Sequence, residues 1–308
     1  MSIAVIVNPA AGRGRAGRLW PEIEAKLKAA LGDVSVYRTD RPGAERALAT
    51  TALAAGADHL IAIGGDGTVN GVTNAILERH GPGSGAAALS TVPAGTANEL
   101  ARYLGVHADI DAAVAAIASG KRREIDILET HCAGLDDGEL RHFAFLAISW
   151  GSAAEISYRT STSRYLKKLG GQFSYYAVTL IVTLTYDNLL GDVRIDDKDM
   201  AGLTHYTGMI CNTEYLGGGM RLAPGADPTD GRADLLLFKN IARKDILLQK
   251  PSWLFEGRHI EHPEVELLPG KDFAVRGPSR ALVDADGETI GRLPLTAWVV
   301  PRGLLVRG

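Results

Sequence analysis

Cysteine is scarce in this chain of 308 residues, which holds only Cys132 and Cys211. The two lie far apart in no metal-ligand spacing, and the eight histidines are scattered. The sequence therefore predicts neither a disulfide framework nor a zinc site. A basic excess is also missing, since the formal net charge is −3. That balance argues against a protein that binds nucleic acid through phosphate contacts.

Long hydrophobic segments are missing as well. The longest apolar stretch, Tyr175 to Tyr186, is too short and too rich in threonine to cross a bilayer. The first residues, MSIAVIVNPA, lack the basic start, the length and the cleavage site of a signal peptide. We therefore expect a cytoplasmic protein. Its length predicts two domains, because single cores stop growing near roughly 250 residues.

The first part of the chain alternates buried strands with helices. Segments of this kind predict parallel strands, right-handed crossovers and a doubly wound α/β sheet whose ligands bind beyond the carboxyl ends of the strands. The expected strands are Ile3–Val7, Val34–Arg38, His59–Ile63 and Ala87–Val92, and the expected helices are Arg15–Leu31, Gly43–Ala54, Thr68–Arg79, Thr96–Leu104 and Asp109–Ser119.

The pattern changes after the segment Lys121–Glu129. Short β-branched segments separated by turn residues follow, interrupted by one helical insert at about 164–190. Such a pattern predicts an antiparallel β-sandwich or barrel. We expect a nucleotide-binding α/β domain over residues 1–128, a β-rich domain over 129–300, and a return of residues 301–308 to the first domain.

The segment GRGRAG, Gly12 to Gly17, is a literal G-x-G-x-x-G between an expected strand and an expected helix. Asp40, near the end of the second strand, stands where a dinucleotide enzyme would hold its ribose. In that fingerprint, however, the strand runs almost straight into the first glycine, whereas here Asn8–Ala11 intervenes and Pro9 lengthens the loop. A loop that simply precedes a helix is the simpler interpretation.

The segment AIGGDGTVNG, Ala62 to Gly71, places Asp66 among glycines directly after a buried strand. Glycines at 64, 65 and 67 allow positive φ angles and a close approach to a ligand. Thr68 is placed to cap a helix whose N-terminus favours phosphate. No lysine follows, so we expect Asp66 to act through a magnesium ion that bridges carboxylate and phosphate.

The segment VPAGTANELAR, Val92 to Arg102, repeats the order of strand, glycine turn and helix. Thr96 and Glu99 have the spacing of a capping box. Capping alone would explain the segment, but parallel strands would bring it beside the GGDGT loop. The two loops together predict a nucleotide crevice.

With these motifs in order, the chain resembles the diacylglycerol kinase catalytic-domain family, which includes sphingosine kinases and bacterial lipid kinases. The resemblance rests on VNPAAGRGR, GGDGTVNGV, VPAGTANELAR, the glycine-rich Glu214–Phe238 and VDADGE at Val283–Glu288. GGDGT alone is shared with NAD kinases and phosphofructokinases, whereas the set of five is specific. The family binds its nucleotide between an α/β domain and a β-rich domain.

The resemblance implies a role for individual residues. Glu288 matches the general base that takes the proton from a lipid hydroxyl, and Asp286 is placed to orient Glu288 or a water. The loop Asp227–Arg232 matches a magnesium-binding loop, although Ala233 stands where the family usually has leucine. Asp126 stands where the family has an acidic residue, and an ordinary strand-end aspartate is an equal alternative. The implied ATP contacts are Asn8, Thr39, Gly64, Gly65, Asp66, Gly67, Thr68, Asn70 and Thr96, and the implied metal-loop residues are Asp227, Asp230 and Arg232.

The resemblance predicts a kinase that uses ATP and magnesium to phosphorylate diacylglycerol or a related lipid, in phospholipid metabolism. The segment Ser163–Val182 places basic residues, among them Lys167 and Lys168, beside an apolar and aromatic helix. This pattern suggests transient contact with a membrane surface, although a core helix with a solvated basic start is the simpler interpretation. A homodimer is compatible with the sequence. The alternatives are an NAD-kinase-like enzyme that phosphorylates a soluble alcohol, an oxidoreductase based on GRGRAG, and a non-catalytic binding module.

Overall fold

In a computed structural model, which describes residues 2–107, 109–136, 138–162, 171–247 and 252–308, the segment Ile3–Val7 forms the inner strand β1. All five of its residues are apolar and buried, as expected for a strand that is covered on both faces. The chain divides into two units, which are described separately. Unit 1 contains Met1–Ile127, Gly217–Gly219 and Val300–Gly308, and unit 2 contains Leu128–Leu216 and Met220–Val299.

Unit 1 is built on a parallel sheet with the strand order β2-β1-β3-β4-β17. All of these pairs are parallel, with Ile3 opposite His59 and Leu305 opposite Ala88. The last residues of the chain therefore form a strand of this sheet. The strands are β2 (Ser35–Arg38), β3 (His59–Gly64), β4 (Ala88–Pro93) and the end of β17 (Glu288–Arg307).

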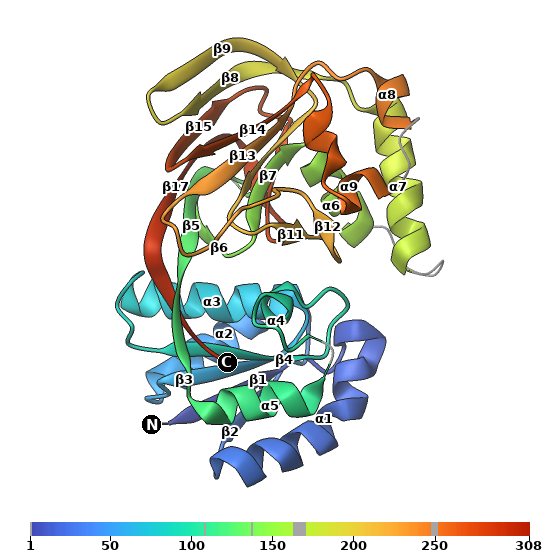
Figure 1. The fold of residues 1–308 in the computed structure, drawn as a ribbon. Helices are drawn as coiled ribbons and strands as arrows, with labels where there is room; N and C mark the ends of the chain where they lie inside the picture. Colours follow the sequence, from blue (N-terminus) through green and yellow to red (C-terminus); the bar gives the residue numbers. More distant parts are fainter. Residues whose placement is uncertain (1, 108, 137, 163–170, 248–251) are drawn as a thin grey trace. The chain divides into compact units, whose positions relative to one another are not determined.

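Helices cover both faces of this sheet (Figure 1). On one face, Val5 and Val7 of β1 pack in one cluster with Trp20 and Ile23 of α1 and with residues of α5. The helices α2 and α3 pack on each other and contact β1 and β3. The expected doubly wound α/β architecture is confirmed. The helices are α1 (Ala11–Leu31), α2 (Glu45–Ala54), α3 (Asp66–His80), α4 (Glu99–Tyr103) and α5 (Ile110–Ser119).

Unit 2 consists mainly of antiparallel strands. One path through the sheet runs β14-β13-β10-β7-β16-β17, and further strands pair with it at β17. The strands are β5 (Arg122–Gly134), β6 (Glu139–Ala144), β7 (Ala147–Gly151), β8 (Leu189–Ile195), β9 (Lys198–His205), β10 (Thr207–Cys211), β11 (Tyr215–Leu216), β12 (Met220–Arg221), β13 (Ala233–Phe238), β14 (Val265–Gly270), β15 (Asp272–Arg276), β16 (Leu282–Ala285) and β17.

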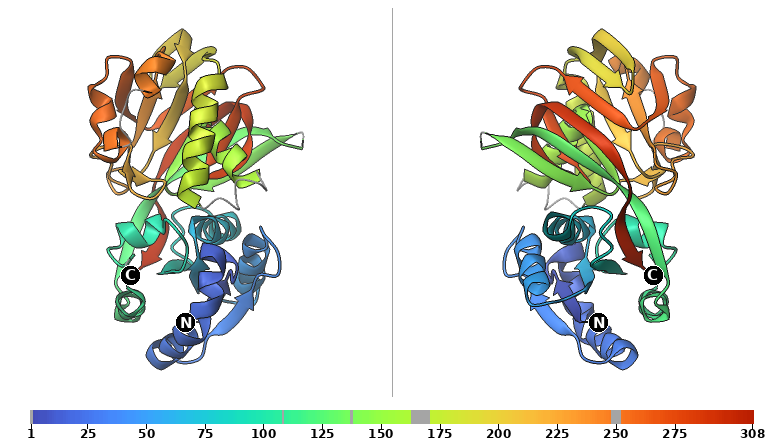
Figure 2. Two further views of the ribbon diagram at one scale, coloured as in Figure 1. Left: turned by 90° about the vertical axis from the view of Figure 1, so that its right-hand side faces the viewer. Right: turned by 90° about the vertical axis from the view of Figure 1, so that its left-hand side faces the viewer.

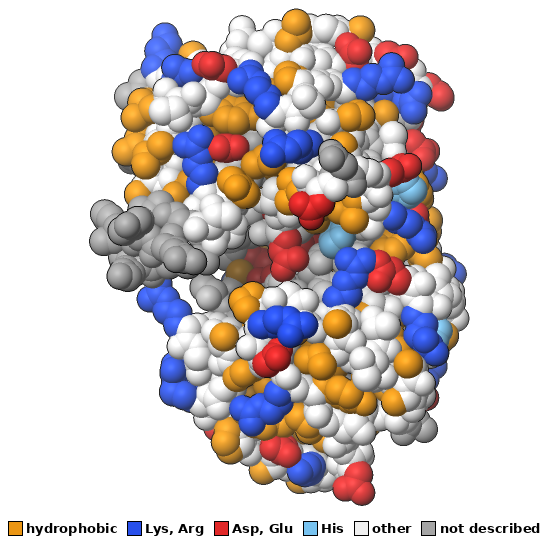
Figure 3. Space-filling view, turned by 180° about the vertical axis from the view of Figure 1, so that it is seen from behind, with side chains coloured by type: hydrophobic (Ala, Val, Ile, Leu, Met, Phe, Trp, Pro, Cys, Tyr) orange, Lys and Arg blue, Asp and Glu red, His pale blue; other side chains and the backbone are white. Residues whose placement is uncertain are grey.

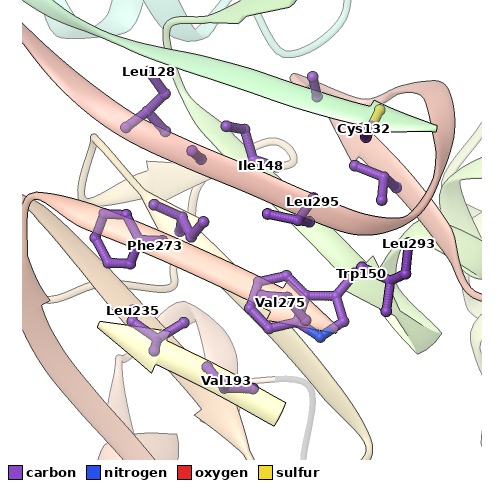
Figure 4. Packing of buried hydrophobic residues seen from close by; sticks show 14 of the residues in the cluster. Leu128, Cys132, Ile148, Trp150, Val193, Leu235, Phe273, Val275, Leu293 and Leu295 are labelled. Carbon is purple, nitrogen blue, oxygen red and sulfur yellow. The ribbon is translucent and has the colours of Figure 1, made fainter. Parts of the chain in front are cut away.

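The core of unit 2 lies between its layers of strands (Figure 4). Trp150 of β7 is fully buried there, in the same cluster as Phe273 and Leu295 of other strands. Neighbouring residues on one strand face opposite ways: Ile210 of β10 belongs to this core, whereas Met209 packs in a second cluster with residues of α9. This period of two is what the alternating sequence predicts for a sandwich, and the expected antiparallel β-sandwich is confirmed.

Helices are more numerous in unit 2 than expected. The single insert predicted at about 164–190 is wrong in its bounds, because α6 (Ser152–Thr162) precedes it and β8 begins at Leu189. The short elements α8 (Arg243–Leu247), α9 (Ser252–Phe255) and the 3₁₀ helix η2 (Arg258–Glu261) were not predicted, and α7 spans Gly171–Thr185. Within the described ranges, no helix combines the length and the apolar character needed to cross a bilayer.

Charged side chains of both signs lie interspersed on the surface drawn in Figure 3. Lys and Arg side chains alternate there with Asp and Glu side chains, as a net charge of −3 leads one to expect.

Candidate active site

Three strand-to-helix loops of unit 1 lie against one another at the carboxyl ends of β1, β3 and β4. We call residues 8–14, 64–67 and 94–98 the loop cluster. A Cβ atom added at Gly95 would lie 2.9 Å from the backbone nitrogen of Gly65, and one at Gly12 would lie 2.6 Å from the carbonyl oxygen of Ala94. Because only glycine permits such approaches, the loops can expose backbone groups to a ligand.

The glycines of the GGDGT loop serve close approach and not unusual backbone angles. Gly64, Gly65 and Gly67 are absent from the residues with positive φ, so that expectation was wrong. In the first loop, by contrast, Gly12, Arg13 and Gly14 do have positive φ angles, of 58°, 58° and 80°. These residues lie inside the first turn of α1, which therefore begins before the expected Arg15. Each loop therefore has a specific backbone conformation that depends on its glycines.

Asp66 caps a helix other than its own. Its carboxylate accepts the backbone N–H of Glu99 at 2.7 Å and that of Asn98 at 3.2 Å. These two amides open α4, so the expected cap by Thr96 is wrong, and Thr96 is exposed in the turn before the helix. Burial raises the pKa of Asp66, and the backbone N–H groups oppose that rise. The loops after β3 and β4 are thus joined by a carboxylate.

Glu99 was predicted only as part of a capping box with Thr96, and that role is also wrong. Its side chain is 3% exposed, accepts the backbone N–H of Gly218 at 2.7 Å and forms an ion pair with Arg102 at 3.2 Å. Burial raises the pKa of Glu99, and the charge of Asp66 adds to the rise. The region therefore holds two carboxylates whose negative charges favour a cation.

Asn8 joins the loop after β1 to two helices. Its Nδ2 donates to Glu45 at 2.8 Å and to the Thr68 hydroxyl at 3.4 Å, and its Oδ1 accepts the Ala10 N–H. Thr68 does not cap α3, since that helix begins at Asp66 and Gly65 is its N-cap residue. Glu45 is 6% exposed. The sequence did not identify it as a site residue, because an acidic residue in the first turn of a helix such as α2 is ordinary.

The remaining predicted nucleotide contacts also belong to unit 1. The backbone N–H of Thr39 donates to Val7 at 2.9 Å, which fixes Thr39 just beyond the end of β1. Asn70 is buried in α3 and accepts from Asn74, one turn later. Most of the nine residues thus lie in or beside the loop cluster, while Asn70 is packed within α3.

Asp126 holds the end of the chain in unit 1. It is 1% exposed, and its Oδ1 accepts the backbone N–H of Arg302 at 2.7 Å. Arg302 has a φ angle of 52°, a conformation that costs a residue with a side chain. The carboxylate of Asp126 therefore has a clear structural role at this bend of β17.

Asp286 and Glu288 lie on the hairpin between β16 and β17 in unit 2. Ala285 faces Glu288 across the antiparallel pair, and Asp286 and Gly287 form the turn with φ angles of 52° and 89°. Positive φ at both positions is typical of the tight turns that suit the twist of a hairpin. Glu288 is exposed at the start of β17, so its side chain can reach a ligand.

The carboxylate of Asp286 is bound by backbone N–H groups. It accepts the N–H groups of Phe145, Leu146 and Ala147 at 2.9, 2.8 and 3.1 Å. The turn between β6 and β7 is thereby tied to the hairpin that carries Glu288. No local pattern in the sequence indicates these partners, which lie about 140 residues earlier.

The predicted metal loop is organised by its own side chains. Asp227 accepts the N–H of Thr229 at 3.0 Å, and Asp230 accepts the N–H of Arg232 at 2.9 Å. Arg232 contributes this N–H, and its cationic side chain cannot ligate a metal. Over the ranges that the structure describes, no group of three His, Cys, Asp or Glu side chains could hold a metal ion. A cation at this loop would need backbone carbonyl ligands beside the two carboxylates.

Comparisons with known proteins agree over nearly the whole chain. A model of the diacylglycerol kinase catalytic domain matches residues 2–130, and a model of the YegS C-terminal NAD kinase beta sandwich-like domain matches residues 147–307. A diacylglycerol kinase of Staphylococcus saprophyticus is 30% identical over 296 residues, covering 94% of this chain and 90% of that protein. One of Staphylococcus carnosus is 30% identical over 293 residues, covering 94% and 89%.

Solved structures support the fold. A diacylglycerol kinase structure from Bacillus anthracis has a TM-score of 0.69 at 22% identity and covers 99% of this chain and 96% of that one. The yeast NADH kinase in complex with NADH has a TM-score of 0.54 at 11% identity, covering 100% and 83%. At these identities the likeness concerns the fold alone.

Proposed function

Because this chain belongs to the diacylglycerol kinase catalytic-domain family, we propose that it transfers the γ-phosphoryl group of ATP to the hydroxyl of diacylglycerol or a related lipid. The observation that carries the proposal is the loop cluster, in which glycine backbones pack together at the carboxyl ends of parallel strands. Such edges are where open α/β sheets bind nucleotides. The product would enter phospholipid biosynthesis.

In this proposal the loop cluster binds the phosphates of ATP. The first turn of α3 presents backbone N–H groups, whose partial positive charge attracts phosphate oxygens. Thr96 lies in the cluster, is exposed, and would donate its hydroxyl to a phosphate oxygen. The remaining residues proposed to bind or shape the ATP site are Asn8, Thr39, Gly64, Gly65, Asp66, Gly67, Thr68 and Asn70.

Magnesium suits the acidic residues of unit 1. Asp66 and Glu99 have raised pKa values because they are buried, and each carboxylate adds negative charge beside the other. A magnesium ion, when bound, neutralises charge on the transferring phosphoryl group. We propose that Asp66 holds it, directly or through a water, while its bonds to α4 keep the carboxylate in place. Asp227 and Asp230 would hold a second, structural ion.

Glu288 is the proposed general base. Phosphoryl transfer depends on positioning and charge neutralisation more than on covalent chemistry, yet the attacking hydroxyl must lose a proton. An exposed carboxylate on a rigid hairpin suits this step. Asp286, given as a possible catalytic partner by the sequence, would act through the backbone contacts that hold the hairpin.

Replacement of Glu288 tests the base assignment. Glu288→Gln should lower turnover by about 10²–10⁴-fold, the usual contribution of a positioned base, while the affinity for ATP stays within about twofold. Asp197→Asn is the matched control, because Asp197 is also an exposed acidic residue beside a hairpin turn of unit 2. Near-normal turnover of Glu288→Gln would remove the assignment.

The helix α7 is the proposed contact with a membrane. Val178 and Val182 are buried in unit 2, yet the side chains of Tyr176, Leu180 and Leu184 are 47–51% exposed. Their spacing of four residues places them on one stripe of the helix, and the helix α7 itself lies in front in the left view of Figure 2. An exposed apolar stripe on a protein that works from the cytoplasm fits transient insertion into the lipid interface. Lys167 and Lys168, expected to help, lie outside the described residues.

An NAD-kinase-like reaction is the second candidate. The observation in its favour is the fold shared with the yeast NADH kinase. In that case the acceptor would be a soluble alcohol, and ATP would phosphorylate NAD or a similar molecule and leave diacylglycerol unchanged. Offering both acceptors to the protein in one assay separates the two candidates.

A further inference from the structure

The hairpin that carries Glu288 contains a third acidic residue, Asp284, on β16. Asp284 is 5% exposed, faces Ser149 of β7 and Thr289 of β17 across the sheet, and follows a β-bulge at Val283. Its surroundings in the sheet are therefore mostly uncharged. Asp284 is the only one of the three acidic residues for which the proposed mechanism has so far given no role.

Asp284 and Ser157 bind the N–H group and the carbonyl oxygen of the same residue, Gly287. The Oδ1 atom of Asp284 accepts the N–H of Gly287 at 3.0 Å. Ser157, from the helix α6, donates its hydroxyl to the carbonyl oxygen of Gly287 at 2.9 Å. That carbonyl belongs to the peptide bond that joins Gly287 to Glu288. The direction in which the Glu288 side chain leaves the hairpin is therefore set by these two contacts.

A buried carboxylate at position 284 costs more free energy than a neutral side chain that accepts the same hydrogen bond. Asp286 satisfies its charge with three backbone N–H groups, but the Oδ2 atom of Asp284 is buried without a hydrogen bond of normal geometry. Burial raises the pKa of Asp284 to about 6, and the Gly287 N–H opposes the rise. An asparagine would accept the same N–H without a buried charge. A costly buried group beside a proposed catalytic residue points to function.

We propose that Asp284 and Ser157 are positioning residues for Glu288, and that they fix the Gly287–Glu288 peptide so that the Glu288 carboxylate meets the lipid hydroxyl in one orientation. This inference rests on the proposed function of Glu288 as the base. An ionised carboxylate is a stronger acceptor than its neutral form, so the turn is held most firmly when Asp284 has lost its proton. The charged neighbour that acts on Asp284 is Asp286; Ser157, Ser149 and Thr289, from α6, β7 and β17, carry no charge.

The test compares Asp284→Asn and Ser157→Ala with the wild type, using ATP, magnesium and diacylglycerol in mixed micelles. Each variant should lose about tenfold in kcat, as expected when one hydrogen bond that orients a reacting group is weakened or lost. The KM values for both substrates should stay within about twofold, and the melting temperature should not fall by more than about 2 °C. Ser161→Ala is the control, because its hydroxyl donates to the Tyr158 carbonyl within α6 and not to the hairpin among the described contacts.

The pH profile adds a second measurement. Wild-type kcat should fall as the pH drops through about 6, where Asp284 takes up its proton. That part of the decline should be absent in Asp284→Asn, whose side chain does not titrate. A purely structural role predicts unchanged kcat and an unchanged profile, whether or not the melting temperature changes.

Glu288→Gln, measured beside these variants, separates the two hypotheses. If Glu288→Gln is inactive while Asp284→Asn and Ser157→Ala keep wild-type kcat and pH profiles, the positioning role is wrong and the proposed base stands. If Glu288→Gln is itself fully active, the proposed base is wrong and the inference falls with it. A loss of kcat in both positioning variants, with intact folding, supports the inference.

Discussion

Asp66 and Asp286 use their carboxylates in the same way. Each lies at a glycine-containing turn that follows a strand, and each accepts backbone N–H groups of a segment far away in the sequence. A carboxylate that accepts two or three such bonds fixes the distant backbone more firmly than a neutral side chain would. An acidic residue among glycines thus has a structural role even before a ligand is considered.

Asp284 leads to a prediction about stability. Its pKa is raised from 3.8 to about 6 in the folded protein, so the folded state holds this proton more tightly than the unfolded state does. Asp284 therefore lowers the free energy of unfolding as the pH rises from about 4 to about 6, by up to ~3 kcal/mol, and the full cost remains at higher pH.

Asp284→Asn should remove this cost. In urea unfolding experiments, the variant should exceed the wild type in stability at pH 7.5 and lose that advantage as the pH falls to 4. Asp197→Asn, which changes an exposed carboxylate, should show little difference at either pH. An equal difference between Asp284→Asn and wild type at pH 4 and pH 7.5 would contradict the burial argument.

Among the elements, the loops that follow β3 and β4 depend on glycine at their contact. Gly95→Ala would place a Cβ atom 2.9 Å from the backbone nitrogen of Gly65, a distance that real Cβ atoms do not adopt, so the two loops must separate. A displacement of about 1 Å can cost about 10²-fold at a reacting site. We expect ATP affinity to fall by about 10–100-fold.

Gly134→Ala is the matched control, because the added Cβ would meet its nearest atom, the Gly138 carbonyl oxygen, at an ordinary 3.4 Å. Binding can be followed with a fluorescent ATP analogue, and circular dichroism confirms that each variant is folded. If Gly95→Ala binds ATP as the wild type does, the loop cluster is not the nucleotide site.

Sequence reasoning located the strands of unit 1 to within about a residue but misplaced several helix ends. These strands could be predicted because β1, β3 and β4 are buried along their whole length and consist mostly of apolar residues. The start of α4 was misread, because its cap comes from Asp66, more than thirty residues earlier. Short helices such as α8 and α9 carry too few residues to show a helical period.

On the scale of the whole molecule, the fold class followed from the change of pattern near residue 129 and from the order of the motifs. What the sequence could not supply is the set of distant partners that give Glu99, Asp286 and Asp284 their roles. The contacts of Glu99 and Asp286, and the bond of Ser157 to the Gly287 turn that Asp284 also holds, join residues more than 100 positions apart, and no local pattern records them. Local sequence patterns therefore indicated which residues are candidate site residues, but not which distant groups those residues contact.

The exposed stripe of α7 leads to a prediction for the protein as a whole. Replacing Leu180 and Leu184 by serine removes apolar surface that is half exposed. Because less apolar area can then be buried at the lipid interface, co-sedimentation with vesicles of phosphatidylglycerol and phosphatidylcholine should fall by about tenfold or more. Leu190→Ser is the control, since Leu190 is 64% exposed but lies on β8. Equal sedimentation of the double variant and the wild type would exclude α7 as the docking element.

The measurement that tests the central claim most directly is the fate of the γ-phosphate. The wild-type protein is incubated with γ-labelled ATP, magnesium, diacylglycerol micelles and NAD, and the lipid and aqueous products are separated. The account predicts labelled phosphatidic acid from the wild type, at least 100-fold less of it from Glu288→Gln in line with the loss of a general base, and no labelled NAD product. Label in a phosphorylated dinucleotide, with none in the lipid, would contradict it.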